Sequence, residues 1–132
     1  MGRCLIEDTN VLIAYERGTL DRAALDADEL AVASVCIAGY RAGIELADTP
    51  ERAADRARSL AAITSAVDVL DCTEAAAACH GRLIACARRL GTPRAANDMI
   101  IAAHAVQTDR IVLAFDAKAQ SSDLPGVTAT SA

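Results

Sequence analysis

The feature that most restricts how this chain can fold is a series of short apolar runs separated by longer helical patterns. One run, at 111–114, has the length of a strand buried on both faces of a sheet, and similar runs lie at 4–6, 30–33 and 67–70. Strands that alternate with helices form parallel sheets covered by helices on both faces. The sequence therefore predicts an α/β fold, a three-layer sandwich with a central, mainly parallel sheet flanked by helices, formed by one domain over residues 1–132. The order of the strands does not follow from this pattern.

Helix starts in this sequence are marked by Ser, Thr, Asn or Pro, and helix ends by Gly, because those residue types favour those positions. Gly18 and Gly91 are expected to end helices, whereas Ser34 and the pair Asn97–Asp98 are expected to cap the starts of two others. The expected helices cover about 11–17, 35–47, 50–65, 74–90 and 97–105.

Composition and charge exclude several classes of protein. No apolar run approaches the roughly 20 residues that a membrane span needs, and the start of the chain lacks the pattern of a signal peptide, so we expect a cytoplasmic protein. The chain has 13 basic and 18 acidic residues and a net charge of -5, the wrong sign for general binding to phosphate backbones. Its two tyrosines and one phenylalanine offer no stacking platform for single-stranded nucleic acid. A passive RNA-binding module is therefore disfavoured, and any contact with RNA must be local.

The five cysteines are expected to be reduced. Five is an odd number, and Cys72, Cys79 and Cys86 recur at every seventh position, which places them on one face of a helix instead of in a disulfide framework. They also lack the closely spaced ligand pairs that are usual in zinc sites. We interpret them as core residues.

Three aspartates stand where parallel α/β sheets place their functional residues. Asp8 and Asp116 each follow a predicted strand, at the carboxyl end where the chain leaves the sheet, and Asp98 stands at a helix start. Taken singly, each has an ordinary explanation as a turn or cap residue. Three converging carboxylates would repel one another, and a divalent cation would neutralise them. Oxygen ligands of this kind suit Mg²⁺ or Mn²⁺, and the matching chemistry is metal-assisted phosphodiester hydrolysis.

Four segments together resemble one known family across nearly the whole chain. The segment 8–14, Asp-Thr-Asn-Val-Leu-Ile-Ala, is similar to the opening motif of PIN-domain ribonucleases of the VapC type, the toxins of toxin–antitoxin pairs. The segment 97–105 resembles the second Asp motif of that family, 112–116 resembles its last strand with the third Asp, and 124–127 resembles its ending. The order and spacing of these segments are more specific than any single Asp motif.

The resemblance implies a Mg²⁺-dependent endoribonuclease, with Mn²⁺ as the alternative ion, that cleaves structured RNA such as an exposed loop of transfer or ribosomal RNA. It implies that Asp8, Asp98 and Asp116 hold the metal and carry the catalysis, and that Thr9 and Asn10 support the carboxylates or the substrate phosphate. Turn and cap roles explain Thr9 and Asn10 equally well. The resemblance further implies a VapB-type antitoxin partner, whose tail places a basic side chain near the acids, and a homodimer.

The sequence departs from the family at the second expected helix. The register of Gly43-Ile44-Glu45-Leu46-Ala47 places the family's metal-site Glu at position 39, which is Gly39 in this chain. Glu45 is six residues further along the helix, so it is expected to point elsewhere, as a solvated charge. Gly39 is either a natural divergence or an inactivating change. A catalytically dead PIN domain that only binds its antitoxin or RNA therefore remains an alternative.

Two further expectations concern acidic residues outside this set. Because side chains alternate along a strand, Glu7 is expected to face away from Asp8 and is not counted as a ligand. A phospho-receiver signalling domain is a rival from another class, because Glu7-Asp8 and Lys118 loosely resemble its acidic pair and lysine; Asp71 would be its phosphorylated residue.

Overall fold

A computed structural model describes residues 2–117 and 124–132 of the chain. Within these residues a five-stranded sheet has the strand order β3-β2-β1-β4-β5, and every neighbouring pair is parallel. β1 is the central strand, with β2 on one side and β4 on the other. The predicted α/β sandwich is therefore confirmed, and its sheet is parallel throughout. The strands are β1 (Cys4–Glu7), β2 (Glu29–Ala33), β3 (Asp68–Leu70), β4 (Ile111–Ala114) and β5 (Ala129–Ser131).

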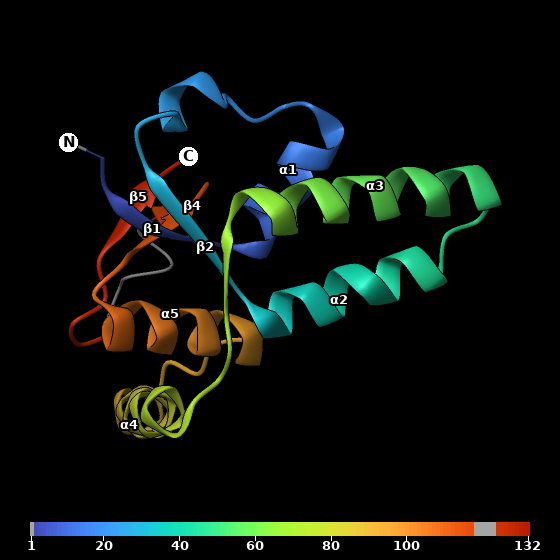
Figure 1. Cartoon of the computed structure of the whole chain (residues 1–132). Helices are drawn as coiled ribbons and strands as arrows, with labels where there is room; N and C mark the ends of the chain where they lie inside the picture. The colour runs from blue at the N-terminus through green and yellow to red at the C-terminus, as the bar shows by residue number, and fades with distance from the viewer. Residues whose placement is uncertain (1, 118–123) are drawn as a thin grey trace.

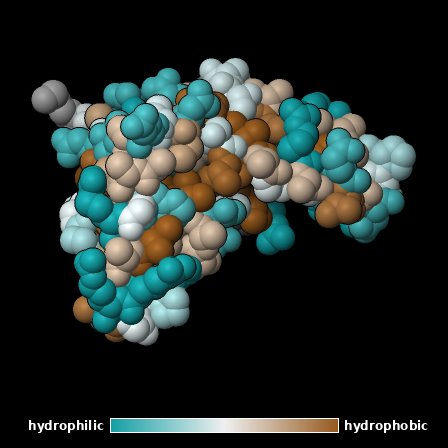
Figure 2. Space-filling model, turned by 90° about the horizontal axis from the view of Figure 1, so that it is seen from below, coloured by the Kyte–Doolittle hydropathy of each residue, from teal (hydrophilic) through white to brown (hydrophobic). Residues whose placement is uncertain are grey.

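Helices cover both faces of this sheet. Figure 1 shows α1 and the short 3-10 helix on one side of it and the packed pair α4 and α5 on the other, while α2 and α3 form a hairpin that extends beyond it. Seen from below, hydrophobic residues gather on the inner side of the bend between the hairpin and the rest of the molecule (Figure 2). No helix among the described residues is long and apolar enough to cross a membrane. The helices are α1 (Thr9–Arg17), the 3-10 helix (Ala23–Leu25), α2 (Ser34–Glu45), α3 (Pro50–Ala66), α4 (Glu74–Leu90) and α5 (Ala96–Thr108).

Most of the expected helix boundaries are confirmed. Gly18 and Gly91 follow α1 and α4 with φ angles of 72° and 68°, the left-handed region that glycine adopts without steric cost. At the start of α3, the Thr49 hydroxyl accepts a hydrogen bond of 3.2 Å from the amide of Arg52. These local signals act within one helical turn, so the sequence alone reveals them.

Two expected caps are wrong. Ser34 is the first residue of α2, and the extended residue before the helix is Ala33 at the end of β2, so strand and helix follow one another directly. Asn97 and Asp98 lie inside the first turn of α5, which begins earlier, at Ala96. Because neither side chain caps a helix, Asp98 is available for another role.

Two other expectations need correction. Cys72 precedes α4 and is exposed, so the seven-residue spacing does not place it in the core; Cys79 is buried and Cys86 is half-buried. All five cysteines are free, as expected. The segment 129–131 forms an edge strand that the sequence analysis missed, because three small or polar residues carry no apolar periodicity.

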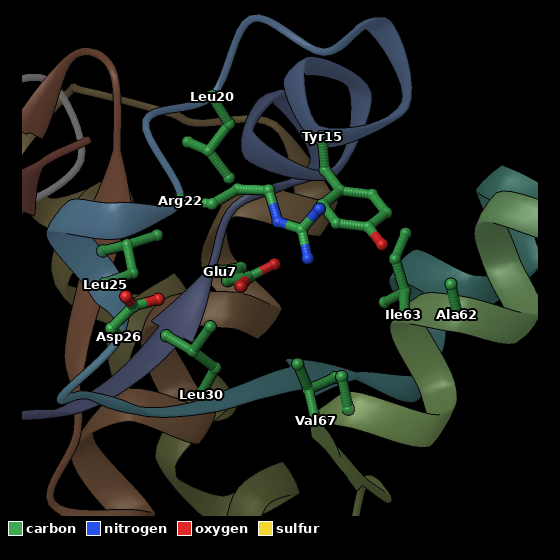
Figure 3. Close-up of a pocket in the computed structure, with 11 residues that line it drawn as sticks. Glu7, Tyr15, Leu20, Arg22, Leu25, Asp26, Leu30, Ala62, Ile63 and Val67 are labelled. Carbon is green, nitrogen blue, oxygen red and sulfur yellow. The ribbon is translucent and has the colours of Figure 1, made fainter.

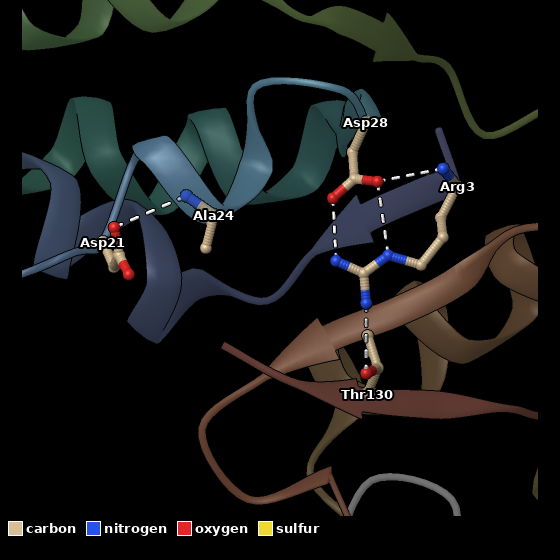
Figure 4. Close-up of polar contacts among 5 residues, drawn as sticks. All are labelled: Arg3, Asp21, Ala24, Asp28 and Thr130. Atoms are coloured by element: carbon tan, nitrogen blue, oxygen red, sulfur yellow. Dashed lines mark hydrogen bonds and ion pairs between the residues drawn. The ribbon is translucent and has the colours of Figure 1, made fainter. Parts of the chain in front are cut away.

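An ion pair joins the start of β1 to its neighbours in the sheet. The guanidinium of Arg3 donates hydrogen bonds of 3.2 and 2.8 Å to the two carboxylate oxygens of Asp28, whose Oδ1 also accepts from the Arg3 amide at 2.9 Å (Figure 4). A third nitrogen of Arg3 lies 3.5 Å from the hydroxyl of Thr130 in β5. Arg3 therefore links the central strand to the turn before β2 and to the edge strand.

Glu7 faces a cavity on the side of α1 and α3, as the alternation along β1 predicts. The cavity has a volume of about 160 Å³, and its walls include Tyr15 of α1, Leu25 of the 3-10 helix and Ile63 of α3. The Glu7 side chain is almost fully buried, and its carboxyl group points into this space (Figure 3). Burial raises the pKa of Glu7 from 4.5 to about 7.

Replacing Glu7 should change how stability depends on pH. The folded protein prefers the protonated form of Glu7, whereas the unfolded chain ionises near pH 4.5, so the free energy of unfolding falls as the pH rises from 4.5 to 7. Relative to Glu7→Leu, the wild type should lose about 3 kcal/mol between pH 4 and pH 8, measured by chemical denaturation. Glu45→Leu, at an exposed position, is the control and should keep the wild-type pH dependence. Parallel profiles for wild type and Glu7→Leu would contradict this assignment.

Candidate functional site

Asp8 is held at the junction of the central strand and the first helix. It directly follows β1, keeps an extended backbone, and is only 5% exposed. Its amide donates a hydrogen bond of 2.9 Å to the carbonyl of Leu113 in β4, and its carbonyl accepts one of 3.0 Å from the amide of Val11. Strand pairing and helix initiation therefore fix the position of this carboxylate.

Asp8 and Asp98 lie close enough to interact electrostatically. Burial raises the pKa of the Asp8 carboxyl group, and the negative charge of Asp98 raises it further. The backbone amides of Thr9 and Asn10 interact with the carboxylate and offset part of this rise. Asp98 reaches Asp8 from the first turn of α5, 90 positions further along the sequence. Two of the three predicted acids are thus brought together.

A third element, α2, contributes a cysteine that the sequence analysis did not select. The hydroxyl of Thr9 donates a hydrogen bond of 3.6 Å to the sulfur of Cys36, which is buried. Burial raises the pKa of the Cys36 thiol, and the nearby charges of Asp8 and Asp98 raise it further. Cys36 is therefore a neutral thiol beside the acids. Its only signal in the sequence is its position three residues before Gly39 on the same helix.

Asp116 lies at the same edge of the sheet but is exposed. It follows β4, which pairs with β1 through Glu7 and Leu113. The acid whose charge raises the pKa of Asp8 is Asp98. Among the residues that the structure describes, no group of three or more His, Cys, Asp or Glu side chains is arranged to hold a metal ion. Asp116 as a third ligand stays a prediction.

Gly39 lines a hollow of about 250 Å³ that also includes Thr9 and Tyr40. A Cβ atom built on Gly39 meets no atom within 4 Å, so a side chain can begin there without displacing its neighbours. Glu45 is exposed near the far end of α2 and is not part of this hollow. The position that the family resemblance assigns to a glutamate is therefore open, next to Thr9, and carries no carboxylate.

Comparison with known proteins identifies the family. The PIN domain family matches residues 5–123, which is most of the chain. The chain belongs to the PIN-domain family. PIN domains are generally nucleases that use divalent metal ions. No curated protein sequence matched this PIN domain.

Solved structures of toxin–antitoxin complexes contain the same fold. A chain of VapBC-5 from Mycobacterium tuberculosis is 26% identical to this PIN domain, with a TM-score of 0.81 over 98% of both chains. A chain of VapBC2 from Rickettsia felis, solved with a promoter DNA fragment, is 17% identical, with a TM-score of 0.85 over 97% of this chain and 98% of that one. A chain of FitAcB from Neisseria gonorrhoeae is 22% identical, with a TM-score of 0.79 over 95% of both. The resemblance to PIN-domain toxins of the VapC type is thus confirmed in family and in fold.

The PIN-domain assignment leaves the receiver-domain rival without support. Asp71, its proposed phosphorylated residue, is exposed after β3 and is not among the charges that act on Asp8. Lys118, the other residue on which that rival depended, lies outside the described residues.

The residues around Asp8 fit a small divalent cation. Mg²⁺ in proteins is usually held by one or two carboxylates, together with water and substrate phosphates. Asp8 and Asp98 supply two carboxylates; burial and, to a smaller extent, the charge of Asp98 raise the pKa of Asp8, and a cation between the two acids offsets both effects. The neutral thiol of Cys36 is a poor ligand for such a hard ion. The donor set therefore suits Mg²⁺ or Mn²⁺ better than a thiophilic metal.

Removing either acid should weaken metal binding. Asp8→Asn and Asp98→Asn each take away one charged oxygen ligand, so the Kd for Mn²⁺ should rise more than about tenfold in both. Asp48→Asn, at an exposed site in the α2–α3 turn, is the control. Isothermal titration calorimetry measures the three affinities. Unchanged Mn²⁺ affinity in Asp98→Asn would show that the two acids do not share an ion.

Proposed function

We propose that this PIN domain is a Mg²⁺-dependent endoribonuclease, the toxin of a VapC-type toxin–antitoxin pair. The observation that carries the proposal is the position of the buried Asp8 at the carboxyl edge of the central strand, where the charge of Asp98 acts on it. A buried carboxylate with a raised pKa and an acidic neighbour is the environment in which a divalent cation is stabilised.

Each residue of the site has a defined task in this proposal. Asp8 and Asp98 would hold the ion, and Asp116 would complete the set from the end of β4. When bound, the ion supplies an activated water and charge stabilisation for phosphodiester hydrolysis. The fixed backbone of Asp8 keeps its carboxylate in place between strand and helix. Thr9 positions the Asp8 segment against α2 through Cys36, and the exposed Asn10 is free to contact a phosphate of the substrate.

The substrate class follows from the local distribution of charge. The net charge of -5 opposes general binding to RNA, so contacts must be concentrated near the site. A hollow of about 250 Å³ between α4 and the start of α5 is lined by His80, Arg88 and Arg94. Its two arginines, together with its place beside the first turn of α5, support a structured RNA as substrate, such as a loop of transfer or ribosomal RNA, with its backbone at these two cations.

The partners of this function are an antitoxin and a second copy of the chain. The structural neighbours are VapBC and FitAB complexes, which supports a VapB-type antitoxin for this protein. Electrostatics favours an antitoxin that places a basic side chain beside Asp8 and Asp98, where it would replace the cation. The exposed Leu46 at the end of α2 and the alanine-rich surface of α3 support a homodimer.

The proposed activity predicts metal-dependent cleavage of RNA. The purified protein should cut folded transfer or ribosomal RNA in Mg²⁺ or Mn²⁺, and EDTA should stop the reaction because the carboxylates alone supply no nucleophile. Gel analysis of the end-labelled RNA measures the rate. The Asp98→Asn variant controls for contaminating nuclease and should be at least about 100-fold slower. Cleavage that persists in EDTA, or equally in Asp98→Asn, would contradict the proposal.

A substitution at Gly39 tests whether the natural chain is an active nuclease or a catalytically inactive one. Gly39→Glu places a carboxylate in open space beside Thr9, so it should tighten Mn²⁺ binding and raise the cleavage rate, each by about tenfold or more. Gly43→Glu is a matched control, because it lies on the same helix and is equally uncrowded but one turn further from the acids.

Three outcomes of this comparison are distinct. Cleavage only in Gly39→Glu supports a catalytically dead natural chain that binds its antitoxin or RNA. Cleavage in both the wild type and Gly39→Glu, faster in the latter, supports a weakened nuclease. No change in metal affinity or rate with Gly39→Glu removes the proposed role of that position.

A further inference from the structure

A second acidic side chain faces a cavity that the proposed nuclease site does not use. Glu7 and Asp8 are adjacent in the sequence, but Asp8 is not among the residues that line the Glu7 cavity. The cavity lies between β1, β2, the 3-10 helix, α1 and α3, and the carboxyl group of Glu7 is at its floor (Figure 3). The carboxylates of Glu7 and Asp8 therefore face different surroundings.

The Glu7 carboxyl group has no partner within the described part of the chain. No described side chain or amide there forms a hydrogen bond or ion pair with it, although Glu7 is only 5% exposed. Arg22 is the cation at the cavity mouth, but its guanidinium carbon lies 5.0 Å from the centre of the Tyr15 ring. Arg22 is thus held by a cation–π contact and leaves Glu7 unpaired. A buried, unpaired carboxyl group is costly unless a ligand satisfies it.

The size and walls of the cavity restrict what that ligand can be. Its volume of about 160 Å³ is below the roughly 300–1,000 Å³ of sites for metabolites and cofactors, and it matches a single large side chain. Leu20, Leu25, Leu30, Ile63 and Val67 form apolar walls. Such walls suit an aliphatic stem, and the carboxylate at the floor suits a cationic end. Lysine and arginine combine these two features.

We propose that the Glu7 cavity receives one lysine or arginine side chain of a partner protein, with the stem against the apolar walls and the cation paired with Glu7. Glu7 is then a specificity determinant, because an apolar residue at the end of β1 would accept any aliphatic side chain equally well. This inference goes beyond nuclease activity, and it requires neither metal nor RNA.

A titration with side-chain analogues tests this proposal on the whole chain. n-Butylamine represents the side chain of lysine, n-propylguanidine that of arginine, and 1-butanol a neutral chain of the same length. Binding is followed by NMR through the backbone amides of Tyr15, Leu25 and Ile63, without metal or RNA. Both cations should bind at least about tenfold more tightly than 1-butanol, because only they form a charge-assisted hydrogen bond with Glu7.

Two variants separate Glu7 from the rest of the cavity. Glu7→Gln should abolish the preference for the cations over 1-butanol, and the NMR spectrum of this variant itself verifies folding. Glu45→Gln removes an exposed carboxylate that is not part of the cavity and should leave the preference unchanged. Glu7→Leu provides a second folded variant, in which the amine should lose its binding while 1-butanol retains it.

Three results would overturn the proposal. They are equal binding of amine and alcohol to the wild type, a cation preference that survives in Glu7→Gln, and amine-induced shifts at Ala96, Asn97 and Asp98 in place of the cavity amides. The last result would place the amine at the Asp8–Asp98 site. Because the titration contains neither metal nor RNA, its failure would leave the nuclease proposal untouched.

Discussion

The burial of Asp8 at the end of the central strand is the constraint on which the rest of this structure depends. The amide of Asp8 continues the pairing of β1 with β4, and its carbonyl begins α1, so its backbone cannot move without disturbing both. Its carboxylate consequently remains buried beside Asp98, and burial together with the charge of Asp98 raises its pKa. A bound cation would offset the repulsion between the two carboxylates. The fold thus creates a site that favours the binding of a positively charged ion or side chain.

The parallel sheet explains why residues so distant in sequence can serve one site. β1 is central, so its carboxyl end is flanked by the ends of β2 and β4. α2 follows β2 directly and brings Cys36 to Thr9, while the first turn of α5 brings Asp98. Successive residues of β1 face opposite sides, so Glu7 enters a separate cavity bounded by α1 and α3. The last residue of β1 and the residue that follows it, Glu7 and Asp8, therefore place their carboxylates in two different surroundings.

Local signals in the sequence predicted much of the fold. Two helices end at Gly18 and Gly91, because glycine tolerates a positive φ angle. Another helix starts after Thr49, because the threonine hydroxyl can cap a backbone amide. Both effects act within a few residues. Strand order and the edge strand at 129–131 were beyond prediction, because pairing with β4 is set by tertiary contacts. The expected cap at Ser34 failed because β2 leads directly into α2, which makes Ser34 the first helical residue, and the cap at Asn97–Asp98 failed because α5 already begins at Ala96.

The site was predictable only in part. Asp8 and Asp98 were recognised from motif spacing, and the structure places them within electrostatic reach of one another. Cys36 escaped notice because a thiol in a helix has no distinctive pattern, and its relevance arises only when α2 packs beside Thr9. Gly39 was recognised as a departure from the family, but the open space around it becomes evident only from the packing of α1 and α2.

The most direct test of a shared cation site is a crystal structure of the protein soaked in Mn²⁺, examined for anomalous scattering from the metal. A manganese peak should lie between the carboxylates of Asp8 and Asp98 and be shared by both. A structure at saturating Mn²⁺ with no peak between these two side chains, or with the ion bound only elsewhere, would contradict it.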